Sequence, residues 1–501
     1  MSENFHKLKE RVARIARLGE VAALVSWDQN TYMPSGAANA RAEQSSTLGQ
    51  FIHELFTSDE TANLLSKSEA DTEGMDSNSD ERRMLSNLRR DFDKATKLPP
   101  DLVAELAHHS SIAQEIWISA RKNDSFAEFA PALEKMFDLT RRQAECLGYK
   151  DHIYDALIDA YEPGAKQRDV AMMFTELKPP LVALTHAIAS SKNPVDDGIL
   201  HASFPVEVQR EVTVRAAVGM GYDLKRGRQD VSAHPFCTSF SNDDVRITTR
   251  FDPQFFSMAF YGTLHETGHA LYEQGLPAKF AQTSIGSAAS LGIHESQSRM
   301  WENLVGRSRN YANFFFPQLQ TAYPEAFGAS NPEAYYRAVN QVKPSLIRVE
   351  ADEVTYNLHI LLRFELECEL LTGSLAIKDL PDAWNSRMKE YLGVTPDSDA
   401  NGVLQDVHWS CGLVGYFPTY SIGNLVSGQL WNSIKKTQPD LDSQIERGEF
   451  SNLLAWLREN VHVHGSKYLP KELVEIATGE KLSSSYYMNY LQEKYADIYG
   501  L

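Results

Sequence analysis

The chain has 501 residues, of which 43% are hydrophobic and 23% are charged, a composition typical of a soluble globular protein with a large core. Its formal net charge of -18 argues against a nucleic-acid-binding protein, which normally presents a basic face, and disfavours binding to anionic membranes. The charged beginning of the chain lacks the apolar core of a signal peptide, and no apolar run approaches the roughly eighteen residues of a membrane span.

Most of the chain carries the periodicity of helices with one apolar face. Near the start, Phe5, Leu8 and Val12 recur at steps of three and four residues, the pattern of a helix that faces a core. The same pattern returns in residues 88–92, 102–118, 126–147 and 170–187. Residues 66–80 are polar, acidic and free of aromatics, which predicts a mobile surface loop between helices.

One stretch, residues 234–251, departs from the helical pattern. Val245 and Ile247 alternate there with polar residues, and residues 241–243 supply a turn. This alternation predicts a short antiparallel hairpin that leads into a helix over residues 257–275. We therefore expect a mainly α fold, with a large helical body and a small antiparallel β-sheet beside that helix.

The cysteines indicate the compartment. The chain has four, which are widely separated and form no C-x-x-C pair: Cys146, Cys237, Cys368 and Cys411. This spacing favours reduced thiols in a cytoplasmic protein over a disulfide framework.

The predicted helix at 257–275 carries a His-Glu-x-x-His motif that begins at His265. His265 and His269 lie one turn apart on the same side of such a helix, so both imidazoles can bind one cation. Glu266 lies about 100° around the helix from His265, close enough to act on a water molecule without being a ligand. Because the triplet arises by chance in roughly a few per cent of chains of this length, the prediction needs a third ligand.

Two possible third ligands on the same helix can be set aside. The extended motif of the metzincins would require glycine at position 272 and histidine at position 275, where this chain has Tyr272 and Gly275. Glu273 follows His269 by one turn, but three ligands along one straight helix do not readily close a tetrahedron. Gly275 instead offers a stop for the helix.

A second helix is therefore expected to supply the third ligand. Residues 290–304 have helical periodicity, with Ser290 as the N-cap and Glu295 in the first turns. His294 is the competing ligand, but neighbouring positions on a helix point in different directions. We favour Glu295, because two histidines and one glutamate form the ligand set of hydrolytic zinc sites, which keep one coordination position open.

Six short motifs, in this order, resemble those of the carboxypeptidase Taq family. They are "HPF" (234–236), "DVRIT" (244–248), "HETGH" (265–269), "HESQ" (294–297), "IRVEAD" (347–352) and "GVLQDVHW" (402–409). Further similar stretches are "SWDQNTYMPSG" (26–36), "YDALIDAYEPG" (154–164) and "GYFPTYSIGNL" (415–425). The likeness extends over nearly the whole chain, and no motif position departs from the family pattern.

The resemblance implies a zinc-dependent carboxypeptidase that removes single residues from peptide C-termini with broad specificity. It implies a mostly helical subunit with a deep central groove, in a homodimer, with one zinc ion per subunit that Co²⁺ or another divalent ion can replace. The family's zinc ligands fall on His265, His269 and Glu295, and its catalytic glutamate falls on Glu266. One catalytic domain is then expected over residues 1–501, with helical parts at about 1–230 and 426–501 and the motifs at 234–425.

The resemblance also places three residues in contact with the substrate: Arg348, His408 and Tyr420. An exopeptidase must recognise a free carboxylate, which the planar guanidinium of arginine matches with two hydrogen bonds. On spacing alone, Arg348 would rather pair with Asp352 four residues later on a helix, and the family likeness reverses that preference. Asp244 and Asp352 are also candidates to accept the second N–H of the metal-binding histidines.

Several readings compete with this one. A metallo-oligopeptidase of similar helical build would cut peptides internally rather than at the free carboxylate. A catalytically silent peptide-binding protein would be expected to have lost Glu266 or one of the ligands. A purely structural zinc site would be closed by four cysteine or histidine ligands, and no cysteine lies near the motif.

Overall fold

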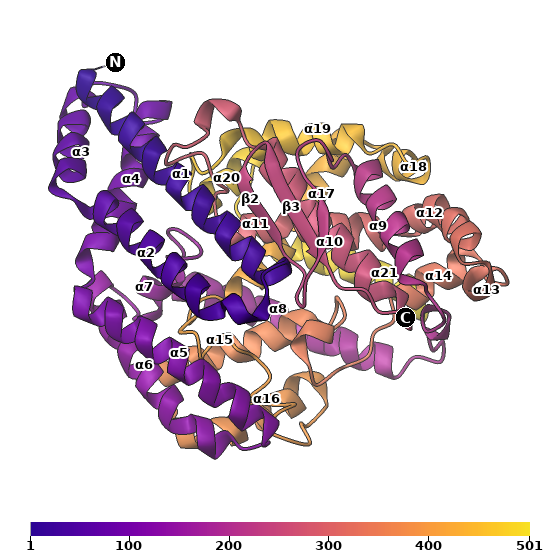
Figure 1. The fold of residues 1–501 in the computed structure, drawn as a ribbon. Helices are drawn as coiled ribbons and strands as arrows, with labels where there is room; N and C mark the ends of the chain where they lie inside the picture. The colour runs from indigo at the N-terminus through magenta and orange to yellow at the C-terminus, as the bar shows by residue number, and fades with distance from the viewer. Residues whose placement is uncertain (1) are drawn as a thin grey trace. The chain divides into compact units, whose positions relative to one another are not determined.

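The computed structural model describes residues 2–501, which form a mostly helical protein with one three-stranded sheet (Figure 1). The chain forms two compact units. The first unit comprises the chain up to Thr96 together with Asp196–Val339 and Val426–Leu482, and the second comprises Lys97–Val195, Asn340–Leu425 and Ser483–Leu501. Each unit is assembled from three separate stretches, and the expectation of one catalytic domain stays a prediction.

The first unit begins with four helices: α1 (Glu3–Thr31), α2 (Ala38–Thr57), α3 (Asp59–Asp71) and α4 (Asp80–Lys97). The predicted stripe on the first helix is confirmed, because Phe5 and Leu8 are buried in a core cluster with Leu65, Leu88 and Phe92. Residues 66–71 belong to α3, so the loop predicted at 66–80 is shorter than expected. Most of the polar residues in 66–71 lie on the exposed or half-exposed faces of this helix, and only Ser68 is buried.

Of the other helices of the first unit, the first precedes the sheet in the chain and the rest follow it. They are α9 (Val206–Met220), α10 (Phe256–Gly275), α11 (Leu291–Arg299), α12 (Arg309–Ala322), α13 (Pro324–Phe327), α14 (Pro332–Val339), α18 (Leu441–Glu446), α19 (Ser451–Asn460) and α20 (Pro470–Thr478). The boundary between the units falls within α17 (Pro418–Thr437). Ser290 caps α11 as expected, because its hydroxyl accepts a hydrogen bond from the Ile293 amide at 3.0 Å.

The sheet lies beside α10, and α1 packs against its strand β2 (Figure 1). Strands β2 (Cys237–Ser241) and β3 (Asp244–Thr249) form the predicted antiparallel hairpin. Strand β1 (Gln229–Val231) pairs with β3 in parallel, so the sheet is mixed rather than purely antiparallel. Three residues are too few to show an alternating pattern in sequence, which is why this strand escaped prediction.

The second unit consists of helices α5 (Pro100–Lys122), α6 (Phe126–Leu147), α7 (Tyr154–Ile158), α8 (Gln167–Ala189), α15 (Tyr356–Thr372), α16 (Leu380–Leu392) and α21 (Ser485–Tyr499). Helices α5 and α6 run side by side, while α15 packs against α6, α8 and α16 (Figure 1). Over most of its length α15 is buried on all sides. Between residues 2 and 501, no helix is both long and apolar enough to cross a membrane.

Candidate metal centre and substrate-binding residues

Helix α10, which carries the His-Glu-x-x-His motif, lies in direct backbone contact with α11. A Cβ atom at Gly268 would lie only 2.5 Å from the carbonyl oxygen of Gln297, so this position requires glycine. The close approach brings side chains of α11 within reach of the two histidines on α10.

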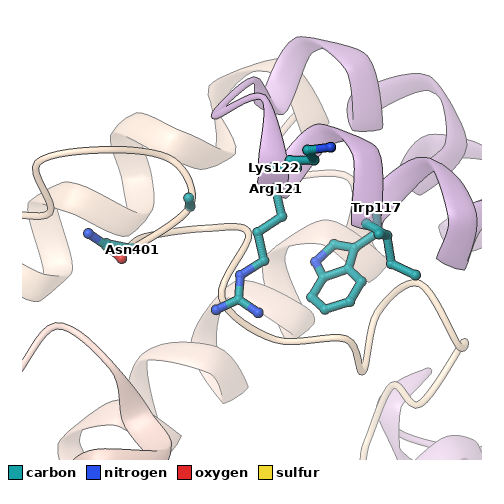
Figure 2. Close-up of a pocket in the computed structure, with 6 residues that line it drawn as sticks. Trp117, Arg121, Lys122 and Asn401 are labelled. Carbon is teal, nitrogen blue, oxygen red and sulfur yellow. The ribbon is translucent and has the colours of Figure 1, made fainter.

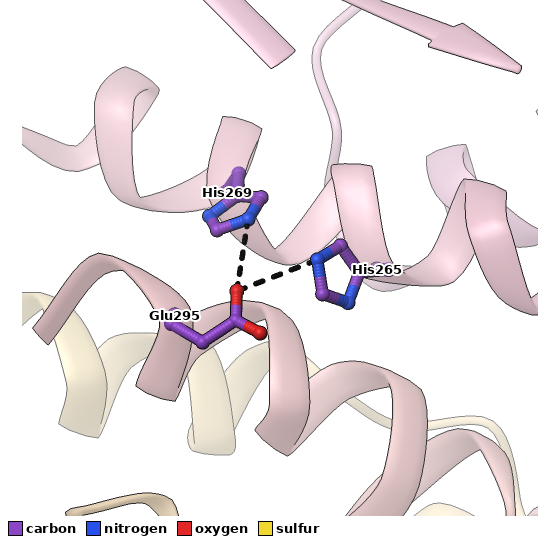
Figure 3. Close-up of side chains that lie close together, drawn as sticks. All are labelled: His265, His269 and Glu295. Atoms are coloured by element: carbon purple, nitrogen blue, oxygen red, sulfur yellow. Dashed lines mark ion pairs between the residues drawn. The ribbon is translucent and has the colours of Figure 1, made fainter. Parts of the chain in front are cut away.

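Glu295 on α11 reaches both histidines (Figure 3). Its Oε2 atom lies 3.4 Å from Nε2 of His265 and 3.4 Å from Nε2 of His269. One donor atom from each of the three residues falls within 4.8 Å of the others. Two imidazoles and one carboxylate on two packed helices are the donor set of a hydrolytic zinc centre. The residues present therefore fit a divalent cation.

The charges around this trio also favour a cation. Burial lowers the pKa of His265, but the carboxylates of Glu295 and Glu302 outweigh it and raise that pKa to about 10, so this ring must release a proton when it binds a metal. Burial and the nearby His294 lower the pKa of His269 to about 3, which leaves this imidazole neutral and able to bind a metal. Against the effect of burial, Arg299 and His265 hold the pKa of Glu295 well below its usual range. The site thus contains an ionised carboxylate and attracts positive charge.

Each histidine is fixed by a partner on its other ring nitrogen, as metal-binding histidines usually are. Nδ1 of His265 lies 2.9 Å from Oε2 of Glu302. Nδ1 of His269 lies 2.5 Å from Nδ1 of His294, whose Nε2 lies 2.9 Å from Oε1 of Glu273. His294, the competing ligand in the sequence, therefore lies behind His269, and Glu273 supports it.

The two aspartates expected in these supporting roles are engaged elsewhere, and that prediction is wrong. Asp244 pairs with Arg246, two residues along the same strand. Asp352 accepts hydrogen bonds from the backbone amides of Lys343 and Thr355. Glu302 was missed although it follows Glu295 by two helical turns, a spacing that places both on one face.

Glu302 lies on a π-helix, η4 (Met300–Gly306), which continues α11. Nη1 of Arg299 and Nη2 of Arg307 each lie 3.4 Å from its carboxylate. Against burial, His265 and Arg299 lower the pKa of Glu302 to about 2, so the group is ionised near neutral pH. Single π-helical turns are common at functional sites.

Glu266, the predicted general base, is only 6% exposed. Burial raises its pKa to about 7, although the positive charge of His265 acts in the opposite direction. A carboxyl group with this pKa can both accept and return a proton near neutral pH.

Arg348 lies in the second unit and is 5% exposed. Its Nε and Nη2 atoms donate to Oδ1 of Asp406 at 3.0 and 2.9 Å, and Nη1 donates to the hydroxyl of Tyr356 at 3.1 Å. The alternative pair with Asp352 does not form, since Arg348 begins a 3-10 turn rather than an α-helical segment. Nε of Arg363 donates to the other oxygen of Asp406 at 2.6 Å. Two guanidinium groups thus share one carboxylate, which leaves a net positive charge.

The other two predicted substrate-binding residues lie around the same cluster. The Arg348 guanidinium is 5.2 Å from the ring centre of Tyr420. The ring of His408 packs 4.6 Å from that of Phe417, and its Nδ1 is 3.8 Å from Oδ1 of Asp406. Burial lowers the pKa of His408 to about 4, so it is neutral near pH 7.

A surface hollow of about 390 Å³ also lies in the second unit, between Trp117, Arg121 and Asn401 (Figure 2). It contains none of the predicted site residues.

Comparison with known proteins extends the likeness over the whole chain. Residues 7–495 match the family described as carboxypeptidase Taq (M32) metallopeptidase. Thermostable carboxypeptidase 1 from Thermus thermophilus is 42% identical, and carboxypeptidase 1 from Bacillus subtilis is 37% identical, with 99% and 97% of each chain covered. The crystal structure of the M32 carboxypeptidase from Deinococcus radiodurans R1 superposes with a TM-score of 0.97 at 41% identity and covers 100% of both chains.

Proposed function

Because the chain belongs to the carboxypeptidase Taq (M32) family and is a metallocarboxypeptidase, we propose that it binds one zinc ion through His265, His269 and Glu295. The observation that carries this proposal is the convergence of their donor atoms within 4.8 Å. Imidazole and carboxylate donors suit zinc, and Co²⁺ or another divalent ion can replace it.

In the proposed mechanism, zinc supplies Lewis acidity, which activates water and polarises the scissile carbonyl. Glu266 accepts the proton of the attacking water and later delivers it to the leaving amine nitrogen. Glu302 and His294 hold the two histidines in the orientation that directs their Nε2 atoms toward Glu295.

Arg348 is proposed to bind the free carboxylate at the end of the peptide. Its bonds to Asp406 and Tyr356 use one N–H of each nitrogen. Each terminal nitrogen therefore keeps one N–H, which together match a planar carboxylate. His408 and Tyr420 are proposed to contact the residue that is released.

The central experiment compares one peptide with a free C-terminus and the same peptide with an amidated C-terminus, each with and without a chelator. We expect stepwise release of single residues from the free acid alone, complete loss with the chelator, and recovery with added zinc. Internal fragments from both peptides would favour the metallo-oligopeptidase. Activity that survived complete metal removal would discard the mechanism.

The role of Arg348 has a matched test. Arg348→Ala should raise KM for the free-acid peptide by at least about tenfold, the loss expected for one charge-assisted pair. Any residual cleavage of the amidated peptide should hardly change. Arg387→Ala is the control, because it removes a cation of the same unit whose partners are Glu365 and Glu369. Equal losses on both peptides would argue against the role of Arg348.

Two further features are proposed. The resemblance supports a homodimer, which light scattering on the purified protein would test. The four free cysteines fit a reducing compartment and therefore a cytoplasmic location, which cell fractionation would test.

A further inference from the structure

Helix α15 is buried yet carries a line of polar side chains. Tyr356, His359, Arg363 and Glu367 recur at steps of three and four residues, and the last three are completely buried. Residues at this spacing share one face of a helix. A buried polar stripe is costly unless hydrogen bonds satisfy it, so its partners indicate what the stripe does.

The partners lie mainly in a segment without regular structure. Residues 393–417, all within the described chain, form no helix or strand. Arg363 donates to Gln405 at 2.8 Å and to Asp406 at 2.6 Å. One turn further along α15, Glu367 accepts hydrogen bonds from the same segment. Side chains of α15 therefore help to order these residues, in addition to the backbone hydrogen bonds within the segment.

Glu367 joins three parts of the second unit. Its Oε1 accepts a hydrogen bond from Nε1 of Trp409 at 2.8 Å. Its Oε2 accepts from the backbone amide of Gly415 at 3.1 Å and from the hydroxyl of Tyr154 at 2.7 Å. Both carboxyl oxygens of Glu367 thus act as acceptors, because all three partners donate. The three donors come from three different motif-like stretches of the sequence, none of which contains Glu367.

Trp409 and Gly415 delimit a short loop next to His408. The backbone carbonyl of His408 accepts hydrogen bonds from the amides of Cys411 and Leu413 inside this loop, at 3.1 and 2.9 Å. Gly415 has a φ of 90°, and a Cβ there would lie 2.9 Å from the backbone nitrogen of Ile158. The loop is thus pinned at both ends, and His408 is adjacent to one of them.

We propose that Glu367 is a positioning residue for substrate binding, which fixes the loop between Trp409 and Gly415 and thereby the imidazole of His408. The proposal rests on the substrate contact assigned to His408 above. Glu367 itself is completely buried and acts through Trp409 rather than on the peptide.

Glu367→Gln tests this directly. A glutamine has one oxygen and one NH2 group, so it cannot accept from Trp409 on one side and from Tyr154 and Gly415 on the other. We expect KM for a free-acid peptide to rise about fivefold or more while kcat changes less than about twofold and metal content is unchanged. Trp409→Phe keeps an aromatic side chain but removes the N–H together with part of the indole ring, so it should raise KM in the same direction even if Glu367→Gln folds poorly.

The control is Glu369→Gln, which neutralises a carboxylate on the same helix that pairs with Arg387 instead. It should leave KM unchanged. The decisive comparison repeats Glu367→Gln in a His408→Ala background, where a residue that acts through His408 should raise KM less than about 1.5-fold. An undiminished, additive effect would overturn the proposal.

The outcomes separate the two proposals. If His408→Ala raises KM but neither Glu367→Gln nor Trp409→Phe does, only the positioning role is wrong. If His408→Ala leaves KM unchanged, the substrate contact of His408 is wrong and the positioning role falls with it.

Discussion

Glu266 and Glu302 both lie near His265, the first buried and the second largely buried, but their environments give them different protonation behaviour. Glu266 has a pKa of about 7 because burial dominates. Glu302 has a pKa of about 2 because His265 and two arginines stabilise its charge. The first suits proton transfer and the second suits permanent electrostatic support of a ligand.

Glu266→Gln should retain the metal but lose turnover. The amide cannot accept a proton from water, so kcat should fall by roughly 10²–10⁴-fold, while the metal content measured by elemental analysis stays at the wild-type level. Near-wild-type turnover would show that another group is the base.

Glu302→Gln should lower the affinity for the metal and not only the turnover rate. The glutamine oxygen can still accept from His265, but the negative charge behind the ring is lost, and such changes cost roughly 10–100-fold in metal affinity. Competition with a chelator measures this. Glu333→Gln is the control, because it removes an exposed carboxylate paired with Arg309. If Glu302→Gln and Glu333→Gln bind the metal with equal affinity, Glu302 does not support metal binding.

Among individual site residues, the sequence best predicts those whose relative positions are set by the geometry of a helix. The spacing of His265 and His269 determines that their side chains share a face, and the need for a third ligand from a second helix favours Glu295. The supporting partners depend on how η4 and α11 pack on α10, which is set by distant contacts. The roles of Arg348, His408 and Tyr420 came from family likeness and stay predictions.

At the scale of elements, the contact between α10 and α11 depends on one glycine. Gly268→Ala would force Gln297 away, so we expect a loss of about 1–3 kcal/mol in the free energy of unfolding together with weaker metal binding. Urea unfolding and chelator competition measure the two effects.

Gly262→Ala on the same helix provides the comparison. A Cβ there meets nothing closer than 3.9 Å, so this change should be neutral or stabilise α10 by up to about 1 kcal/mol. If the two alanine variants have equal free energies of unfolding and equal metal affinities, α10 and α11 can move apart without a loss of stability.

The hairpin was predictable because alternation and a turn mark it locally. The polar stripe of α15 was not, because a helix buried on every side shows no contrast between faces. The polar positions of α15 are set by their hydrogen-bond partners in the irregular segment 393–417. Such tertiary contacts produce no periodic pattern in the sequence.

At the scale of the whole molecule, Glu367 links stability to pH. Burial raises its pKa to about 7, above the ordinary value of 4.5 expected in the unfolded chain. Between these values the unfolded state releases the proton while the folded state keeps it. The stability contribution of this group is therefore complete below about pH 4.5 and is lost as pH rises to about 7.

The expected size is about 3 kcal/mol. Other titrating groups cancel when wild type is compared with Glu367→Gln, so the difference between their free energies of unfolding should fall by that amount from pH 4.5 to pH 7.5. A difference independent of pH would show that Glu367 is already ionised in the folded protein at low pH.

The assembly of each unit from three separate stretches has a consequence for biosynthesis. In the second unit, α21 packs against α8, and the hydroxyl of Tyr499 accepts a hydrogen bond from the Val342 amide at 2.8 Å. Helices α8 and α21 are separated by more than half of the chain, and Val342 and Tyr499 by a large part of it. Helices made early must therefore wait for residues 485–499 to leave the ribosome, and nascent chains should depend on chaperones until that segment has emerged.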